Sequence, residues 1–99
     1  MMRRPRQHWK IDAHATAWKQ FNALTYPQKQ GVFAALLPVL EANDPAHASG
    51  VRDLQGKLAG YYRVRARDHR VIFEIRRTPT GRFRGIIYII AILDRKDAY

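Results

Sequence analysis

The sequence contains no cysteine and only one serine, and both absences narrow its possible functions. Without cysteine the chain cannot form disulfides, bind metals through thiolates or use a thiol nucleophile, and this composition suits a reducing cytoplasm. Ser49 falls in an expected loop, so a serine nucleophile is not indicated. No Gly-rich loop joins a strand to a helix, and the four histidines lack metal-ligand spacing. The sequence therefore predicts no metal and no cofactor.

Long apolar runs are also missing. The longest run, 86–93, has eight residues, whereas a membrane-spanning helix needs about 20. The basic start is not followed by an apolar segment, unlike a secretory signal, and we interpret residues 1–6 as a flexible basic tail. The sequence therefore predicts a cytoplasmic protein with no membrane partner, folded as one domain over residues 1–99.

Acidic residues are scarce compared with basic ones, and the excess charge is uneven along the chain. The 99 residues include 18 Lys and Arg but eight Asp and Glu, which gives a formal net charge of +10. Residues 51–99 hold twelve of the basic and five of the acidic residues. Thirteen of the basic residues are Arg, whose planar guanidinium group matches phosphate geometry. The charge predicts a polyanionic partner that binds the C-terminal half.

The first half has the pattern of a strand followed by two helices. Residues 8–12 alternate polar and apolar, which predicts a short strand with Trp9 and Ile11 directed inward. A helix is expected over 14–24, and a second one should begin at the capping box of residues 25–28 and stop by 43–45. The apolar faces of both helices should meet the core, through Ala15, Trp18, Phe21, Leu24, Val32, Phe33, Leu36, Leu37 and Leu40.

The second half changes to the pattern of strands. Residues 61–67 alternate strictly, a turn is expected at 68–69, and residues 70–75 alternate again. The continuous apolar segment 86–93 predicts a central strand that is covered on both faces for much of its length. Together these elements predict an α+β fold with an N-terminal strand, an αα-hairpin and a three-stranded antiparallel meander.

Alternation places several cations on one side of the 61–67 strand. Arg63 and Arg65 are two residues apart, so their side chains should leave the same face about 7 Å from each other. Tyr61 and Arg67 share this side, and Arg70 joins it if the hairpin register allows. Like charges crowded on one face repel each other, so the cluster is suited to an external anion. Converging guanidinium groups fit the phosphate backbone of RNA or DNA.

Such a site can cleave RNA without a metal ion. The ribose 2′-OH is an internal nucleophile, so the protein needs only to orient it, remove its proton and stabilise the charged transition state. Tyr99, His69 and Tyr61 are the candidates for proton transfer, because phenol and imidazole groups can act as general acids or bases. The remaining arginines are interpreted as general attraction to an RNA-rich target (Arg3, Arg4, Arg6, Arg76, Arg77, Arg82 and Arg84).

Three blocks of the second half resemble the RelE/ParE superfamily of toxin–antitoxin toxins, and the RelE branch most closely. They are LQGKLAGYYRVR over 54–65, DHRVIFEI over 68–75 and DRKDAY over 94–99. The resemblance implies the fold of that family and a toxin that cleaves mRNA on the ribosome. It also implies a cognate antitoxin as partner, with operator DNA bound only indirectly through the antitoxin complex.

The resemblance also implies a role for individual residues. Arg63 and Arg65 would position and activate the phosphate and the 2′-OH, and Arg70 would stabilise the charge of the transition state. Arg95 would bind or protonate near the leaving group, and Tyr99 would orient the 2′-OH and stack on a base. The expected RNA-binding residues around them are Lys57, Tyr61, Arg67, His69 and Lys96.

Two other functions remain compatible with the sequence. One is a ParE-like inhibitor of DNA gyrase, and the other is a noncatalytic nucleic-acid-binding module that uses the same basic face. The combination of several arginines with Tyr99 favours cleavage, because a gyrase inhibitor does not need a convergent phosphate site with an aromatic partner.

Overall fold

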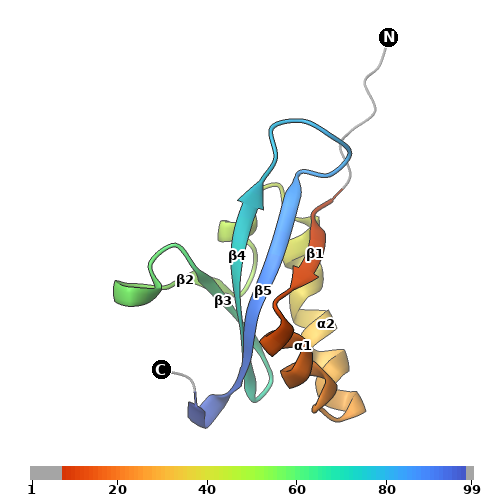
Figure 1. The fold of residues 1–99 in the computed structure, drawn as a ribbon, viewed down its shortest axis with the longest axis vertical. Coiled ribbons are helices and arrows are strands. Elements are labelled where there is room, and N and C mark those ends of the chain that lie inside the picture. Colours follow the sequence, from red (N-terminus) through yellow and green to blue (C-terminus); the bar gives the residue numbers. More distant parts are fainter. Residues whose placement is uncertain (1–7, 98–99) are drawn as a thin grey trace.

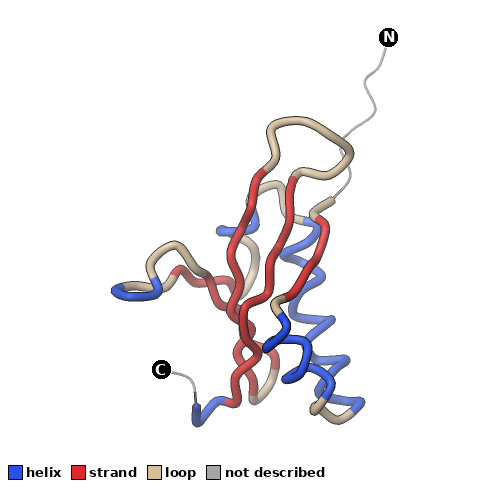
Figure 2. Tube along the Cα trace, viewed as in Figure 1, coloured by secondary structure: helices blue, strands red, loops and turns tan. Residues whose placement is uncertain are grey.

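In the computed structural model, which describes residues 8–97, one mixed sheet carries two helices on one of its sides (Figures 1 and 2). The strands are β1 (Lys10–Ala13), β2 (Val51–Asp53), β3 (Tyr62–Ala66), β4 (His69–Arg77) and β5 (Gly85–Asp94). The helices are α1 (Ala15–Asn22) and α2 (Tyr26–Glu41), with short 3₁₀ segments η1 (Pro45–His47), η2 (Gly56–Leu58) and η3 (Arg95–Asp97). The α+β class is confirmed, while the expected tail at 1–6 lies outside the described residues.

The five strands follow the order β1-β5-β4-β3-β2, in which β1 runs parallel to β5 and every other neighbouring pair is antiparallel. The predicted meander is therefore present as β3-β4-β5. Strand β2 was not predicted, because three residues are too short to show alternation. The prediction that β5 is covered on both faces is wrong, because Ile87 and Ile89 are buried while the residues between and beside them are only half-buried.

Helix α2 begins where the capping box predicts. The Thr25 Oγ1 atom accepts a hydrogen bond from the Gln28 backbone N–H at 3.4 Å, and the Gln28 Oε1 atom accepts one from the Thr25 N–H at 2.8 Å. These reciprocal bonds satisfy two of the donors that a helix start leaves without partners. The helix continues through Pro38 and ends at Glu41, before the expected stop.

The core lies between α2 and the sheet. Its most deeply buried large side chains come from α2 and from the middle of β4 and β5, namely Val32, Leu36, Val39, Val71, Phe73 and Ile87. Because these strand residues alternate with residues on the opposite face, the helices cover only one side of the sheet. The other side, which we call the open face, has no helix over it in Figure 1.

The predicted inward face of the helices is only partly correct. Ala17 is buried in α1, whereas Trp18 and Phe33 are 53% and 59% exposed, and Leu37 is exposed as well. Ile11 lies on the helical side of β1 but is exposed at the edge of the sheet. Helix α1 is short and packs on β5 near this edge, so Ala17 is its only buried residue, Phe21 is half-buried against the core, and the predicted inward Ala15 is exposed. Ile11, Trp18 and Phe33 line an apolar groove of about 110 Å³ together with Phe21.

A carboxylate ties the end of β4 to η1 and makes stability sensitive to pH. Asp44 accepts hydrogen bonds from His47 Nδ1 at 2.8 Å and Arg77 Nη2 at 2.9 Å, and these bonds, that of His47 first, hold the pKa of the Asp44 carboxyl below its usual value. A lowered native pKa stabilises the fold above the unfolded pKa, about 3.9, and this stabilisation is lost as pH falls through the native pKa.

Asp44→Asn should therefore lower the midpoint of thermal unfolding slightly at pH 7, and the difference from the parent should shrink as the pH falls below about 3.9. The measurement is thermal unfolding by circular dichroism across this pH range. Asp53→Asn is a suitable control, because that carboxylate accepts a bond only from the neutral amide of Gln55 among the described hydrogen bonds. A difference that stays constant down to pH 3 would contradict the proposed role of Asp44.

Candidate nucleic-acid interface

The register of the strands brings four arginines to the open face. Arg65 lies directly opposite Arg70 across β3 and β4, and Arg52 lies directly opposite Arg63 across β2 and β3. Residues that face each other across an antiparallel pair project to the same side, and so do residues two apart on one strand. We call Arg52, Arg63, Arg65 and Arg70 the open-face arginines.

These arginines differ in exposure. Arg52 and Arg65 are exposed, while Arg63 and Arg70 are half-buried. The Nη1 atom of Arg70 lies 3.5 Å from the carbonyl oxygen of His69, at the long limit for a hydrogen bond. A half-buried guanidinium group keeps a more restricted position than a fully exposed one, so Arg63 and Arg70 are the better placed to orient a bound phosphate.

The electrostatics of the open face favour an anionic ligand. Two arginine pairs lie directly opposite each other across neighbouring strands, and such like-charge pairs destabilise a sheet. Among residues 8–97, no ion pair involves Arg52, Arg63 or Arg65. Glu74 shares this face but pairs with Arg76, and its hydrogen bond raises the pKa of the Arg76 guanidinium. The nearest acid on the strand is thus engaged elsewhere, and an external anion would relieve the repulsion.

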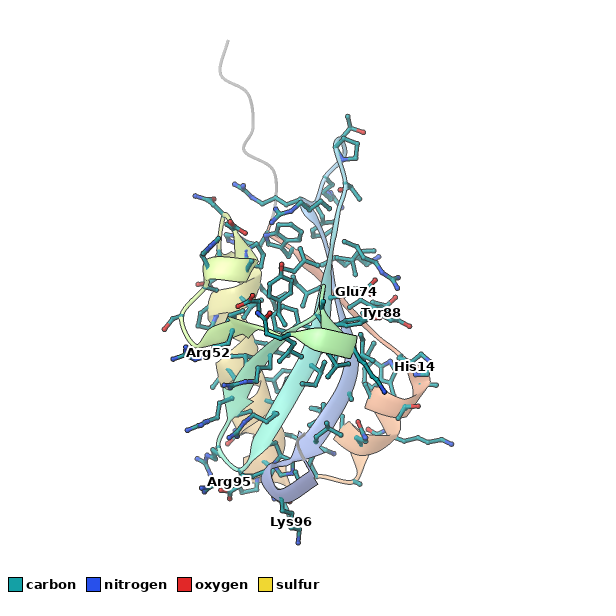
Figure 3. All side chains as sticks on the ribbon, turned by 90° about the vertical axis from the view of Figure 1, so that its left-hand side faces the viewer. His14, Arg52, Glu74, Tyr88, Arg95 and Lys96 are labelled. Atoms are coloured by element: carbon teal, nitrogen blue, oxygen red, sulfur yellow. The ribbon has the colours of Figure 1, made fainter. Side chains whose placement is uncertain are left out.

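The start of η3 is fixed to the same end of the sheet as the Arg65–Arg70 pair. The backbone N–H of Arg95 donates to the carbonyl oxygen of Asp68, in the β3–β4 turn, at 2.6 Å. Arg95 and Lys96 are both exposed there, and Figure 3 shows them together at the lower end of the molecule. Tyr99 lies outside the described residues, so its predicted role stays a prediction.

Two of the predicted RNA-binding residues do not join the open-face arginines. The turn comprises Arg67 and Asp68 instead of 68–69, so His69 is the first residue of β4 and is buried on the helical side, opposite Ala66. Arg67 has a positive φ of 58° and leaves the alternation of β3. Its side chain lies over Gly31 of α2, where an added β-carbon would be 3.4 Å from the Arg67 Cδ atom.

Lys57 and Tyr61 belong to the connection between β2 and β3. Lys57 is exposed in η2, on the segment that projects from the sheet in Figure 1. Tyr61 precedes β3, is half-buried, and accepts a hydrogen bond from the Leu54 N–H through its carbonyl oxygen at 3.0 Å. Both are at the β2 side of the sheet, the side on which Arg52 is found.

Arg52 is the residue that the sequence analysis missed. Figure 3 shows it on the side of the molecule that carries β2, above Arg95. It extends the row of cations from the β3–β4 hairpin to the edge strand of the sheet. The only signal available in the sequence was an Arg two residues after Gly50, which does not distinguish a strand residue from a loop residue.

The described residues offer neither a metal site nor a membrane span. Within 8–97 no three His, Asp or Glu side chains are close enough to hold a metal ion together. No helix in the same range is both long and apolar enough to cross a bilayer.

Known structures share this architecture, although no family model and no curated protein matches the sequence. The YoeB/ParE toxin from Agrobacterium tumefaciens is 14% identical, with a TM-score of 0.70 over 86% of this chain and 97% of that chain. The chain has the RelE/ParE toxin fold. The fold implied by the sequence resemblance is thus confirmed.

Two further structures support the RelE/ParE fold. The archaeal RelE–RelB complex from Pyrococcus horikoshii contains a chain that is 20% identical, with a TM-score of 0.65 over 93% of this chain and 100% of that chain. The YoeB dimer from Staphylococcus aureus is 18% identical, with a TM-score of 0.66 over 87% and 95% of the two chains. At these identities the likeness concerns the RelE/ParE fold, and side-chain chemistry must be argued from this chain itself.

Proposed function

We propose that this protein is the toxin of a toxin–antitoxin system and acts as a metal-independent endoribonuclease that cleaves mRNA on the ribosome. The observation that carries the proposal is the set of open-face arginines on a RelE/ParE fold. Four guanidinium groups on one uncovered face suit a phosphodiester and the charge that develops on it during cleavage.

The proposed reaction uses the substrate's own hydroxyl group. The ribose 2′-oxygen loses its proton and attacks the adjacent phosphorus, the bond from phosphorus to the 5′-oxygen breaks, and that oxygen takes up a proton. The products are a 2′,3′-cyclic phosphate and a 5′-OH end, so atoms and charge balance without a cofactor. In this proposal Arg63 and Arg65 align the phosphate and the 2′-OH, because they rise from one face two residues apart on β3.

The other proposed roles follow from position. Arg70, opposite Arg65, stabilises the negative charge of the transition state, and Arg95 acts at the leaving oxygen from the same end of the sheet. Tyr99 orients the 2′-OH. His69 is not given a proton-transfer role, because it is buried on the helical side of the sheet.

A cognate antitoxin is the proposed protein partner. Related folds were solved as a RelE–RelB complex and as a YoeB–YefM complex. This chain presents a basic open face and an apolar groove with exposed Trp18 and Phe33, so a partner with acidic and apolar segments would complement both. Coverage of the open-face arginines by such an acidic segment would keep the toxin inactive.

The decisive experiment is induced expression in bacterial cells, followed by mapping of mRNA 5′ ends across the transcriptome. The expected result is new 5′-OH ends at codon positions within translated regions, together with arrest of translation. If growth stops with DNA-damage induction and no new mRNA ends, the protein is a gyrase inhibitor instead. If neither signal appears in cells without the antitoxin, the toxin proposal fails.

A further inference from the structure

The end of the sheet opposite the β3–β4 turn carries a second concentration of positive charge. Residues 76–86, the ends of β4 and β5 with the loop that joins them, form an arm at the top of Figures 1 and 2. We call this segment the β4–β5 arm. It contains four arginines and no acidic residue.

Two of these arginines hold the base of the arm in place. Arg77 pairs with Asp44 at 2.9 Å, and its Cζ atom lies 5.4 Å from the ring centroid of Trp9. Arg76 pairs with Glu74, and its Cζ atom lies 3.9 Å from the ring centroid of Tyr88. Their charges are thus partly neutralised and their side chains are positioned by contacts within the protein.

The loop of the arm is itself fixed by hydrogen bonds. The Thr78 N–H donates to the Arg84 carbonyl oxygen at 3.1 Å, and the Thr78 hydroxyl donates to the Phe83 carbonyl oxygen at 3.0 Å. In this braced loop Arg82 is exposed and Arg84 is half-buried, and the exposed Lys10 lies beside the loop on β1. None of these three cations forms an ion pair with another residue in the range 8–97.

These three cations, which form no ion pair within residues 8–97, lie on both sides of the arm. Arg84 lines a hollow of about 380 Å³ with Trp9, Arg77 and Pro79, whereas Arg82 lines a separate hollow of about 200 Å³ with Lys10 and Thr80. A basic ribbon with charges on both sides can contact two phosphate strands at once, as happens when a ribbon lies along a groove between two backbones.

The arm has the composition of a nucleic-acid contact and lacks that of a protein contact. Protein interfaces depend on buried aromatic or aliphatic anchors. The exposed large hydrophobic residues of the described chain are Ile11, Trp18, Tyr26, Phe33 and Leu37, and none belongs to the arm. Guanidinium groups together with threonine hydroxyls are instead typical donors to phosphate oxygens.

The arm is too far from the open-face arginines to bind the same phosphate. Arg70 and Arg77 are seven residues apart on β4, which corresponds to about 23 Å at 3.3 Å per residue. The two basic regions must therefore contact different parts of a large RNA, or different molecules. A folded RNA with many helices, such as ribosomal RNA, can supply both the distant phosphates and the scissile one.

We propose that the β4–β5 arm is a second RNA-binding surface, which docks on the phosphate backbone of a ribosomal RNA helix through Arg82, Arg84 and Lys10. This inference rests on the proposed function, since it makes the ribosome the partner of the arm. The arm supplies affinity for the ribosome, while the open-face arginines act on the mRNA.

The test compares two double variants that each remove two positive charges. Arg82→Ala/Arg84→Ala changes the arm, and Lys19→Ala/Lys29→Ala changes the helices as the matched control. Affinity for vacant 70S ribosomes is measured at several salt concentrations, so binding is recorded whether or not the protein cleaves RNA. The single-turnover rate of mRNA cleavage at saturating toxin is measured separately, and circular dichroism verifies folding.

The arm variant should bind vacant ribosomes at least tenfold more weakly than the parent, and the slope of log affinity against log salt should fall by about 2. The control should lose much less affinity at 0.15 M salt, where charges more than about 8 Å from the RNA are screened. Arg82→Lys/Arg84→Lys should retain the slope, and cleavage at saturation should stay within twofold of the parent for all variants.

The inference is overturned if the parent does not bind vacant ribosomes or if both double variants lose equal affinity. It is also overturned if the arm variant loses affinity for duplex DNA or for anionic lipid vesicles but not for ribosomes. An arm variant with weakened ribosome binding, in a protein that shows no mRNA cleavage, would reject the nuclease activity while retaining the docking surface.

Discussion

Arg70→Ala should abolish growth arrest and lower the single-turnover rate of mRNA cleavage by about 10²–10³-fold, the loss typical when one donor to a developing oxyanion is removed. Arg70 is half-buried and opposite Arg65, so its guanidinium group is restricted in position on the open face. Circular dichroism verifies that the variant is folded. The rate is measured on programmed ribosomes with purified toxin.

Arg76→Ala is the matched control for this experiment. Arg76 is on the same strand and the same face as Arg70 and carries the same charge, but it is paired with Glu74 and stacked on Tyr88. It should retain cleavage at saturating toxin within a few-fold of the parent. A folded Arg70→Ala protein that arrests growth as strongly as the parent would show that the open-face arginines are not the catalytic site.

Gly85→Ala should destabilise the protein severely, by roughly 3 kcal/mol or more, since it combines overpacking with a strained backbone. Gly85 has a φ of +155°, and an added β-carbon would overlap the carbonyl oxygen of Arg76 and lie 2.6 Å from the Trp9 ring. The Arg76 backbone and the buried Trp9 ring cannot both move away from this β-carbon without disturbing the β4–β5 pairing. Urea unfolding of the purified variant, followed by tryptophan fluorescence, measures the change.

Gly31→Ala is the opposite case and serves as its control. Gly31 lies inside α2, and an added β-carbon would meet only the flexible Arg67 side chain, at 3.4 Å from its Cδ atom. Alanine should therefore stabilise the helix by up to about 1 kcal/mol. If both alanine variants unfold at the same urea concentration as the parent, the tight packing around Gly85 is not a determinant of stability.

Short-range patterns in the sequence were sufficient to predict much of the fold. The Thr25–Gln28 capping box marks the start of α2 because both of its bonds form within four residues. The alternation in 61–67 and 70–75 marks β3 and β4 because each strand has one buried side. Exposure of Trp18 and Phe33 could not be deduced, because it depends on where α1 packs along the sheet and not on its periodicity.

The position of the β3–β4 turn differs from the prediction by one residue, and this difference decides on which face of the sheet His69 lies. With the turn at 67–68 instead of 68–69, His69 moves into β4 and onto the helical side, since a shift by one residue reverses the face of a side chain. Arg63, Arg65 and Arg70 came together because the pairing of Arg65 with Arg70 preserves their common face. Arg52 depends on the pairing of a three-residue strand, which no local pattern specifies.

The hydrogen bond between the Arg95 N–H and the Asp68 carbonyl oxygen has a practical consequence for protein engineering. It directs the chain out of the sheet beside the Arg65–Arg70 pair, so a fluorescent label attached at the exposed Lys96 would lie at the same end of the sheet as these open-face arginines. Trp9, beside Arg77, places the beginning of the described chain at the end with the β4–β5 arm. Labels at these two ends of the described chain would thus obstruct different basic surfaces.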